Sequence, residues 1–123
     1  MHKILIADDE EMIRELVRVT LSRDSSFEIS VARDGAEALQ QVLETEPDLA
    51  ILDVRMPEMT GLEVCQAIRD QEKEGPYILM LTAMGQASDI QAGQDAGAND
   101  YMIKPFSPAN LLTKVYEILE KAA

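Results

Sequence analysis

The sequence has one cysteine, no tryptophan and few basic side chains among its 123 residues. The single cysteine, Cys65, excludes an internal disulfide and a metal site built from several cysteines, and we expect it to be a small core residue. Lysine and arginine together number 11 against 23 aspartates and glutamates, so the formal net charge is -12. Charge of this sign repels nucleic acids and anionic lipids at long range, and we expect no direct nucleic-acid binding by this chain.

Long hydrophobic runs are also missing. No apolar stretch approaches the roughly 20 residues needed to cross a bilayer, and the N-terminus lacks the apolar segment of a signal peptide. We therefore expect a cytoplasmic protein without membrane contacts. Low-complexity segments and linkers are absent too, whereas 46% of the residues are hydrophobic. This composition and length predict one domain, covering residues 1–123, with a substantial core.

Short apolar runs alternate with helical patterns along the chain, which is typical of a parallel α/β sheet. Three runs, 3–7, 49–53 and 77–82, are apolar on both faces, as central strands covered by helices should be. The run 27–32 alternates apolar and polar residues, and the run 100–104 is short, so both are predicted to be edge strands.

Helix start signals separate these strands. The segment 11–22 carries one apolar face, and Asp34 and Thr60 each precede a glutamate three positions later, in the spacing of a capping box. Ser107 followed by Pro108 predicts the start of the last helix.

The segment 87–100 has alanine and glycine where the other helices have leucine or isoleucine. Gly93 in its interior costs about 1 kcal/mol of helix propensity, so this should be the least stable helix. Five strand-helix units and right-handed crossovers predict a doubly wound parallel sheet with the strand order 2-1-3-4-5.

Polar residues stand where the strands end: Asp8 and Asp9, Asp53, Thr82 and Lys104. Because parallel strands end at the same edge of a sheet, these side chains should converge. Three carboxylates at one point repel one another, and a divalent cation with oxygen ligands, such as Mg²⁺, removes the conflict. With the lysine and the threonine hydroxyl as donors and one carboxylate as nucleophile, the site suits a phosphoryl group.

At these positions the sequence resembles the receiver domain of two-component response regulators. The resemblance covers essentially all 123 residues and runs through ADDE (7–10), LDVRMPEMTG (52–61), LTA (81–83) and GANDYMIKPF (97–106). Each motif lies at a predicted strand end, in the family's order and spacing. The resemblance implies a flavodoxin-like fold of five βα units.

The family pattern implies a role for each acid of the site. Asp53 would be the phosphoacceptor, taking a phosphoryl group from a phosphohistidine. Asp9 and Asp53 would be ligands of Mg²⁺, or of Mn²⁺ in its place, with Asp9 bound directly, and Asp8 would act largely through a water molecule. Arg55 would contribute its backbone carbonyl to the metal.

Thr82 and Lys104 would bind the phosphoryl oxygens, and the Lys104–Pro105 bond is expected to be cis. Tyr101 would be the switch aromatic, moving inward when Thr82 is drawn to the phosphate. The surface formed by the helix at 87–100, the strand at 100–104 and the last helix would change as a result.

The resemblance also implies partners. A sensor histidine kinase or a phosphotransfer protein would supply the phosphoryl group. The switch surface would contact an output domain or protein, or a second copy of the chain. The chain would be a phosphoacceptor that assists its own phosphorylation and dephosphorylation, not an enzyme.

The family pattern leaves two positions near the site open. Arg55 and Met84 each lie two residues beyond a site residue, and we hypothesise that they set the lifetime of the phosphorylated state. Glu10 and Glu11 are interpreted as acids of a first helical turn, favoured by the helix dipole.

Three other classes of protein are weighed against this reading. A flavodoxin-like electron carrier needs a phosphate-binding loop where this chain has Asp-Asp-Glu. A phosphatase of the haloacid-dehalogenase type needs a second aspartate where Arg55 stands. A receiver-like interaction module that no longer takes phosphate is the remaining alternative, and the intact site residues argue against it.

Overall fold

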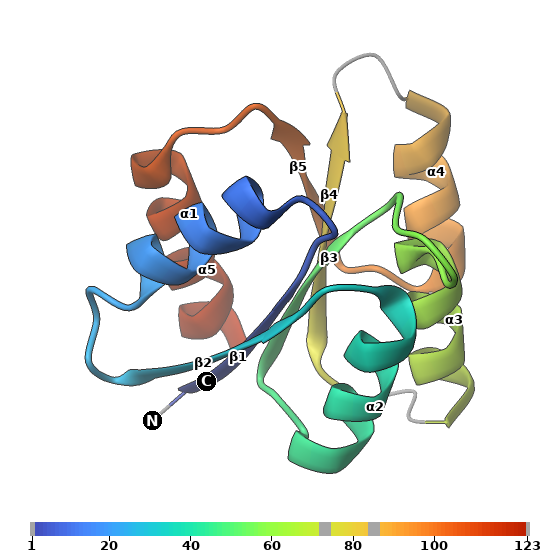
Figure 1. Ribbon diagram of the computed structural model, residues 1–123, viewed down its shortest axis with the longest axis horizontal. Coiled ribbons are helices and arrows are strands. Elements are labelled where there is room, and N and C mark those ends of the chain that lie inside the picture. Colours follow the sequence, from blue (N-terminus) through green and yellow to red (C-terminus); the bar gives the residue numbers. More distant parts are fainter. Residues whose placement is uncertain (1, 72–74, 84–86, 123) are drawn as a thin grey trace.

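The computed structural model describes residues 2–71, 75–83 and 87–122, and Figure 1 shows its ribbon. In this part of the chain the strands are β1 (His2–Ala7), β2 (Phe27–Ala32), β3 (Leu49–Asp53), β4 (Tyr77–Ala83) and β5 (Asp100–Lys104). The helices are α1 (Glu11–Leu21), α2 (Gly35–Thr45), α3 (Gly61–Gln71), α4 (Ala87–Ala96) and α5 (Pro108–Ala122). All neighbouring strands are parallel, in the order β2-β1-β3-β4-β5. The predicted doubly wound sheet is therefore confirmed.

Helices cover both faces of the sheet, with α1 and α5 on one side and α2, α3 and α4 on the other (Figure 1). Strand β1 shows how its residues divide between the two cores. Ile4 and Ile6 pack with α1 and α5, whereas Leu5 and Ala7 pack with α2 and α3, and all four are fully buried. The two-sided burial explains why the central strands are apolar throughout. No helix among the described residues is long and apolar enough to span a bilayer.

The helix starts follow the caps expected from the sequence. The Asp34 carboxylate accepts a hydrogen bond from the backbone N–H three residues on. Thr60 and Glu63 form a reciprocal capping box, with N···O distances of 3.2 and 3.0 Å. The Ser107 hydroxyl caps α5 in the same way as Asp34 caps α2.

The loop after β3 returns closely to its own strand. The backbone N–H of Gly61 donates to the carbonyl of Val54 at 3.0 Å. A side-chain Cβ at position 61 would collide with the carbonyl oxygen of Asp53. Glycine at the start of α3 therefore lets the chain pack against the end of β3, where Asp53 lies.

Helix α4 differs from the other helices in what it buries. Its buried residues are Asp89 and Gly93, an acid and a glycine. The small residues noted in the sequence leave α4 with little buried apolar surface, which fits the expectation of a weakly held helix.

Candidate functional site

A cleft of about 220 Å³ lies at the carboxyl edge of the sheet, and the strand ends determine which side chains reach it. It is lined by Asp9, Glu10, Asp53, Val54, Arg55, Thr82, Ala83, Asp89 and Lys104. Asp8 is fully buried and contacts the lysine of the cleft. The structure thus brings together the five strand-end residues that the topology predicted to converge.

The ammonium group of Lys104 contacts three carboxylates at this cleft. Its Nζ lies 2.9 Å from Asp8 Oδ2, 3.3 Å from Asp53 Oδ2 and 3.3 Å from Glu10 Oε1. Burial alone would lower the pKa of Lys104, but the contact with Asp8 and the charges of Asp53 and Glu10 outweigh it and raise the pKa. The ammonium group is therefore charged at neutral pH and offsets part of the negative charge around it.

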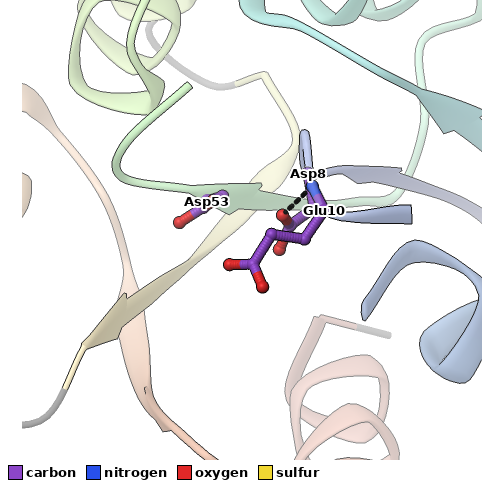
Figure 2. A group of neighbouring side chains, drawn as sticks. All are labelled: Asp8, Glu10 and Asp53. Atoms are coloured by element: carbon purple, nitrogen blue, oxygen red, sulfur yellow. Dashed lines mark hydrogen bonds between the residues drawn. The ribbon is translucent and has the colours of Figure 1, made fainter. Parts of the chain in front are cut away.

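Three of the acids form a tight group, which Figure 2 shows as sticks. Carboxylate oxygens of Asp8, Glu10 and Asp53 all lie within 4.8 Å of one another. Asp8 Oδ1 accepts a hydrogen bond from the backbone N–H of Glu10 at 2.9 Å, drawn as the dashed line in Figure 2. The buried Asp8 is thus held in place by the turn that follows β1.

The role given to Glu10 from the sequence alone missed this contact. Glu10 lies one residue before α1, has extended backbone angles and makes no side-chain capping hydrogen bond. Its carboxylate instead reaches Lys104. Glu11, by contrast, is in the first turn of α1 as expected.

Asp9 is placed differently from its neighbours. Its side chain is exposed and lines the cleft, and it lies outside the group of three acids. Its assignment as a direct metal ligand stays a prediction.

Asp53 ends β3 at the floor of the cleft, with 6% of its surface exposed. Burial, reinforced by the negative charge of Asp8, raises the pKa of Asp53 to about 7, although Lys104 and the backbone N–H of Arg55 act against the shift. The ionised carboxylate is therefore held in an unfavourable environment, which an additional positive charge would relieve.

Thr82 and Tyr101, on the neighbouring strands β4 and β5, both line a small, mostly apolar cavity beneath α4, of about 10 Å³. Thr82 is buried, and its Oγ1 has no hydrogen-bond partner among the described residues. Tyr101 is 39% exposed on β5. The Lys104–Pro105 peptide bond is cis.

Arg55 extends from the loop after β3 along the cleft. Its backbone N–H lies 3.4 Å from Asp53 Oδ1, and its guanidinium lies 3.2 and 3.3 Å from the two carboxylate oxygens of Asp89. No motif of the sequence singles out Asp89. Met84, the other residue expected to control the phosphorylated state, lies outside the described residues.

The donor set of the cleft fits a hard divalent cation. Carboxylates and a backbone carbonyl are the oxygen ligands that Mg²⁺ prefers. Lys104 is the one cation in contact with the three grouped acids in the described part of the chain, so these acids keep a surplus of negative charge. A divalent ion would remove that surplus and lower the pKa of Asp53.

A doubly wound parallel sheet with acids, a threonine and a lysine at its carboxyl edge defines a receiver-type α/β domain. The chain belongs to the response regulator receiver domain family, whose family model matches residues 4–116.

Two curated relatives come from Bacillus subtilis. The chain is 44% identical over 120 residues to the alkaline phosphatase synthesis transcriptional regulatory protein PhoP, and 43% identical over 121 residues to the transcriptional regulatory protein ResD. Each alignment covers 98% of this chain and 49% of the relative. The chain therefore spans about half the length of the curated relatives it matches.

Solved structures of similar length share the fold. A putative response regulator from Chloroflexus aurantiacus has 41% identity and a TM-score of 0.88, over 97% of this chain and 98% of that one. The chemotaxis protein CheY4 of Vibrio cholerae has 39% identity and a TM-score of 0.87, over 96% and 98% of the two chains.

Proposed function

We propose that residues 1–123 form one receiver domain that accepts a phosphoryl group on Asp53 from the phosphohistidine of a sensor histidine kinase or a phosphotransfer protein. The observation that carries the proposal is the buried Asp53 carboxylate at the floor of a cleft, 3.3 Å from Lys104 Nζ. A carboxylate oxygen attacks phosphorus, the P–N bond breaks, and its electron pair leaves with the imidazole nitrogen. The chain is then a phosphoacceptor that assists its own modification, not an enzyme.

The other residues of the cleft bind and orient the incoming group. Lys104 offers an ammonium to one phosphoryl oxygen, and the Thr82 hydroxyl, which has no hydrogen-bond partner in the described part of the chain, offers a hydrogen bond to another. Mg²⁺, or Mn²⁺ in its place, would be held by Asp9 and Asp53 with the carbonyl of Arg55, and by Asp8 through water. The cation, when bound, supplies positive charge to the phosphoryl oxygens.

The same threonine connects the site to the surface. If Thr82 turns toward the phosphoryl group, the cavity beneath α4 gains room for the Tyr101 side chain, which also lines it. The surface of α4, β5 and α5 would change and alter contacts with an output domain or protein, or with a second copy of the chain. This role needs no direct nucleic-acid binding by this chain and no membrane, and it suits a cytoplasmic protein.

Loss of the phosphoryl group by hydrolysis ends the signal. Arg55 borders the cleft beside Asp53, and Met84 follows Thr82 by two residues. We keep both as residues that set the lifetime of the phosphorylated state, to be tested by replacing each in turn and measuring the rate of dephosphorylation.

The proposal is tested by intact mass after incubation with acetyl phosphate or phosphoramidate, with and without Mg²⁺. We expect one phosphoryl group on the parent only when Mg²⁺ is present, and none on Asp53→Ala. Asp70→Ala is the matched control, because Asp70 is exposed on α3 and contacts only Gln66 among the interactions described. If neither donor modifies the parent while Mg²⁺ still raises its melting temperature, the metal site stands and the interaction-module alternative replaces phosphotransfer.

A further inference from the structure

Asp89 is a carboxylate in the first turn of α4 whose place in the fold the proposed function leaves unexplained. It is 9% exposed, and it lines both the cleft at the carboxyl edge of the sheet and the small cavity beneath α4. Among its contacts is the guanidinium of Arg55, at 3.2 Å. Asp89 therefore stands where the site of chemistry meets the space that Tyr101 would enter.

We propose that Asp89 is a positioning residue that holds the Arg55 guanidinium beside α4 in the unphosphorylated chain and gives it up to the phosphoryl group on Asp53. The inference rests on the proposed function, because it takes Asp53 as the phosphoacceptor. It extends that function by naming the group that competes with the phosphoryl oxygens for Arg55.

Arg55 is placed so that its guanidinium can move from Asp89 to a phosphoryl group on Asp53 over a short path. Its backbone N–H already lies 3.4 Å from Asp53 Oδ1, so a rotation of the side chain alone can bring the guanidinium toward a group on Asp53. The Arg55 side chain is 69% exposed, whereas that of Asp89 is 12% exposed. The ion pair between a largely exposed guanidinium and a carboxylate is weak, whereas a phosphoryl group offers more charge and bidentate hydrogen bonding.

The exchange would loosen α4 at one end. The other end is fixed by a second arginine, because Arg69 Nε donates to the carbonyl of Gly97 at 2.9 Å and Arg69 Nη2 donates to Asn99 Oδ1 at 2.8 Å. Cys65 Sγ adds a contact with the carbonyl of Ala96 at 3.4 Å. Release of Asp89 would therefore free the first turns of α4 and leave its C-terminal end in place.

The test compares Asp89→Asn with the parent, using acetyl phosphate as an anionic donor and measuring both phosphorylation and the decay of the phosphoryl group by intact mass. Asparagine keeps the shape and removes the charge that holds Arg55. We expect phosphorylation to be about 2- to 5-fold faster and decay to be slower by a similar factor, as for loss of one competing surface ion pair.

A double-mutant comparison shows whether Asp89 acts through Arg55. In an Arg55→Gln background, Asp89→Asn should change neither rate, because no guanidinium is left to release. Asp95→Asn is the matched control, since it removes the same charge from an exposed position of α4 that contacts Gln91. It should leave both rates as in the parent.

Hydrogen exchange provides a readout apart from the chemistry. Unphosphorylated Asp89→Asn should exchange faster than the parent in the first turns of α4 and equally at the end held by Arg69. A parent that takes no phosphoryl group on Asp53 overturns the proposed function and this inference together. If the parent is phosphorylated on Asp53, two results overturn this inference alone. One is that Asp89→Asn has the same rates of phosphorylation and decay as the parent. The other is that Asp89→Asn changes these rates equally in the presence and in the absence of Arg55.

Discussion

Replacing Asp53 by asparagine should stabilise the metal-free protein. Asp53 is 6% exposed, lies beside the buried Asp8, and has a pKa raised from 3.8 to about 7 by burial and by that neighbouring charge. Ionising it in the folded state therefore costs free energy that the unfolded chain does not pay. Asparagine has the size of the protonated acid and removes this cost.

The magnitude follows from the shift. The pKa of Asp53 rises from 3.8 to about 7, and each pKa unit corresponds to about 1.4 kcal/mol. The gain in the free energy of unfolding on replacing Asp53 is therefore at most about 4 kcal/mol. Because the cleft is open to water on one side, which screens the charges, we expect about 2 kcal/mol. For a domain of this size that is a rise of roughly 6 to 10 °C in melting temperature.

The pH dependence of stability tests separately whether ionised Asp53 destabilises the folded state. Between 3.8 and about 7 the folded parent binds a proton at Asp53 that the unfolded chain has lost, so this residue's contribution to stability falls as the pH rises through that window. The advantage of Asp53→Asn should thus be full at about pH 8 and small at about pH 4.

The assay is thermal or urea unfolding in the presence of a chelator, for the parent, Asp53→Asn and the exposed control Asp70→Asn. The control changes the net charge equally but touches no acid of the cleft. A variant that is no more stable than the parent at about pH 8, or whose advantage does not shrink toward about pH 4, would refute the reasoning.

Three further predictions rest on the contacts of Lys104 and on two glycines. Lys104→Met leaves the buried Asp8 without its closest cation, so urea unfolding of the metal-free protein should show a loss of about 3 kcal/mol, and an equal stability to the parent would contradict the pairing. Gly93→Ala should raise stability by about 0.5 to 1 kcal/mol, since its Cβ would meet Met80 at an ordinary 3.5 Å. Gly61→Ala, whose Cβ would collide with the backbone of Asp53, should lower the melting temperature in a thermal scan. A higher melting temperature would show that the loop after β3 shifts to make room for the Cβ.

The fold follows from the sequence because its signals are local and strong. The strands β1, β3 and β4 are apolar on both faces, and capping residues mark the starts of α2, α3 and α5. Parallel pairing then requires the strand ends to converge, so the sequence alone predicts that Asp53, Thr82 and Lys104 meet at one edge of the sheet.

The site was less predictable where the geometry depends on single side-chain directions. Asp9 and Glu10 are adjacent acids, and only the turn after β1 determines that Glu10 reaches Lys104. Asp89 and Asp95 are both acids of α4, yet the way α4 lies on the sheet buries one and exposes the other. No local pattern carries that information, because both differences come from tertiary packing.

The buried cysteine makes the molecule convenient to label. Cys65 is fully buried, and burial raises the pKa of its thiol to about 11, so it is almost entirely protonated and unreactive at neutral pH. A cysteine introduced at the exposed Ser88, on the first turn of α4, would therefore be the one thiol that an alkylating dye reaches. Because the chain also has no tryptophan, such a dye would report on this turn of α4 without background from the protein.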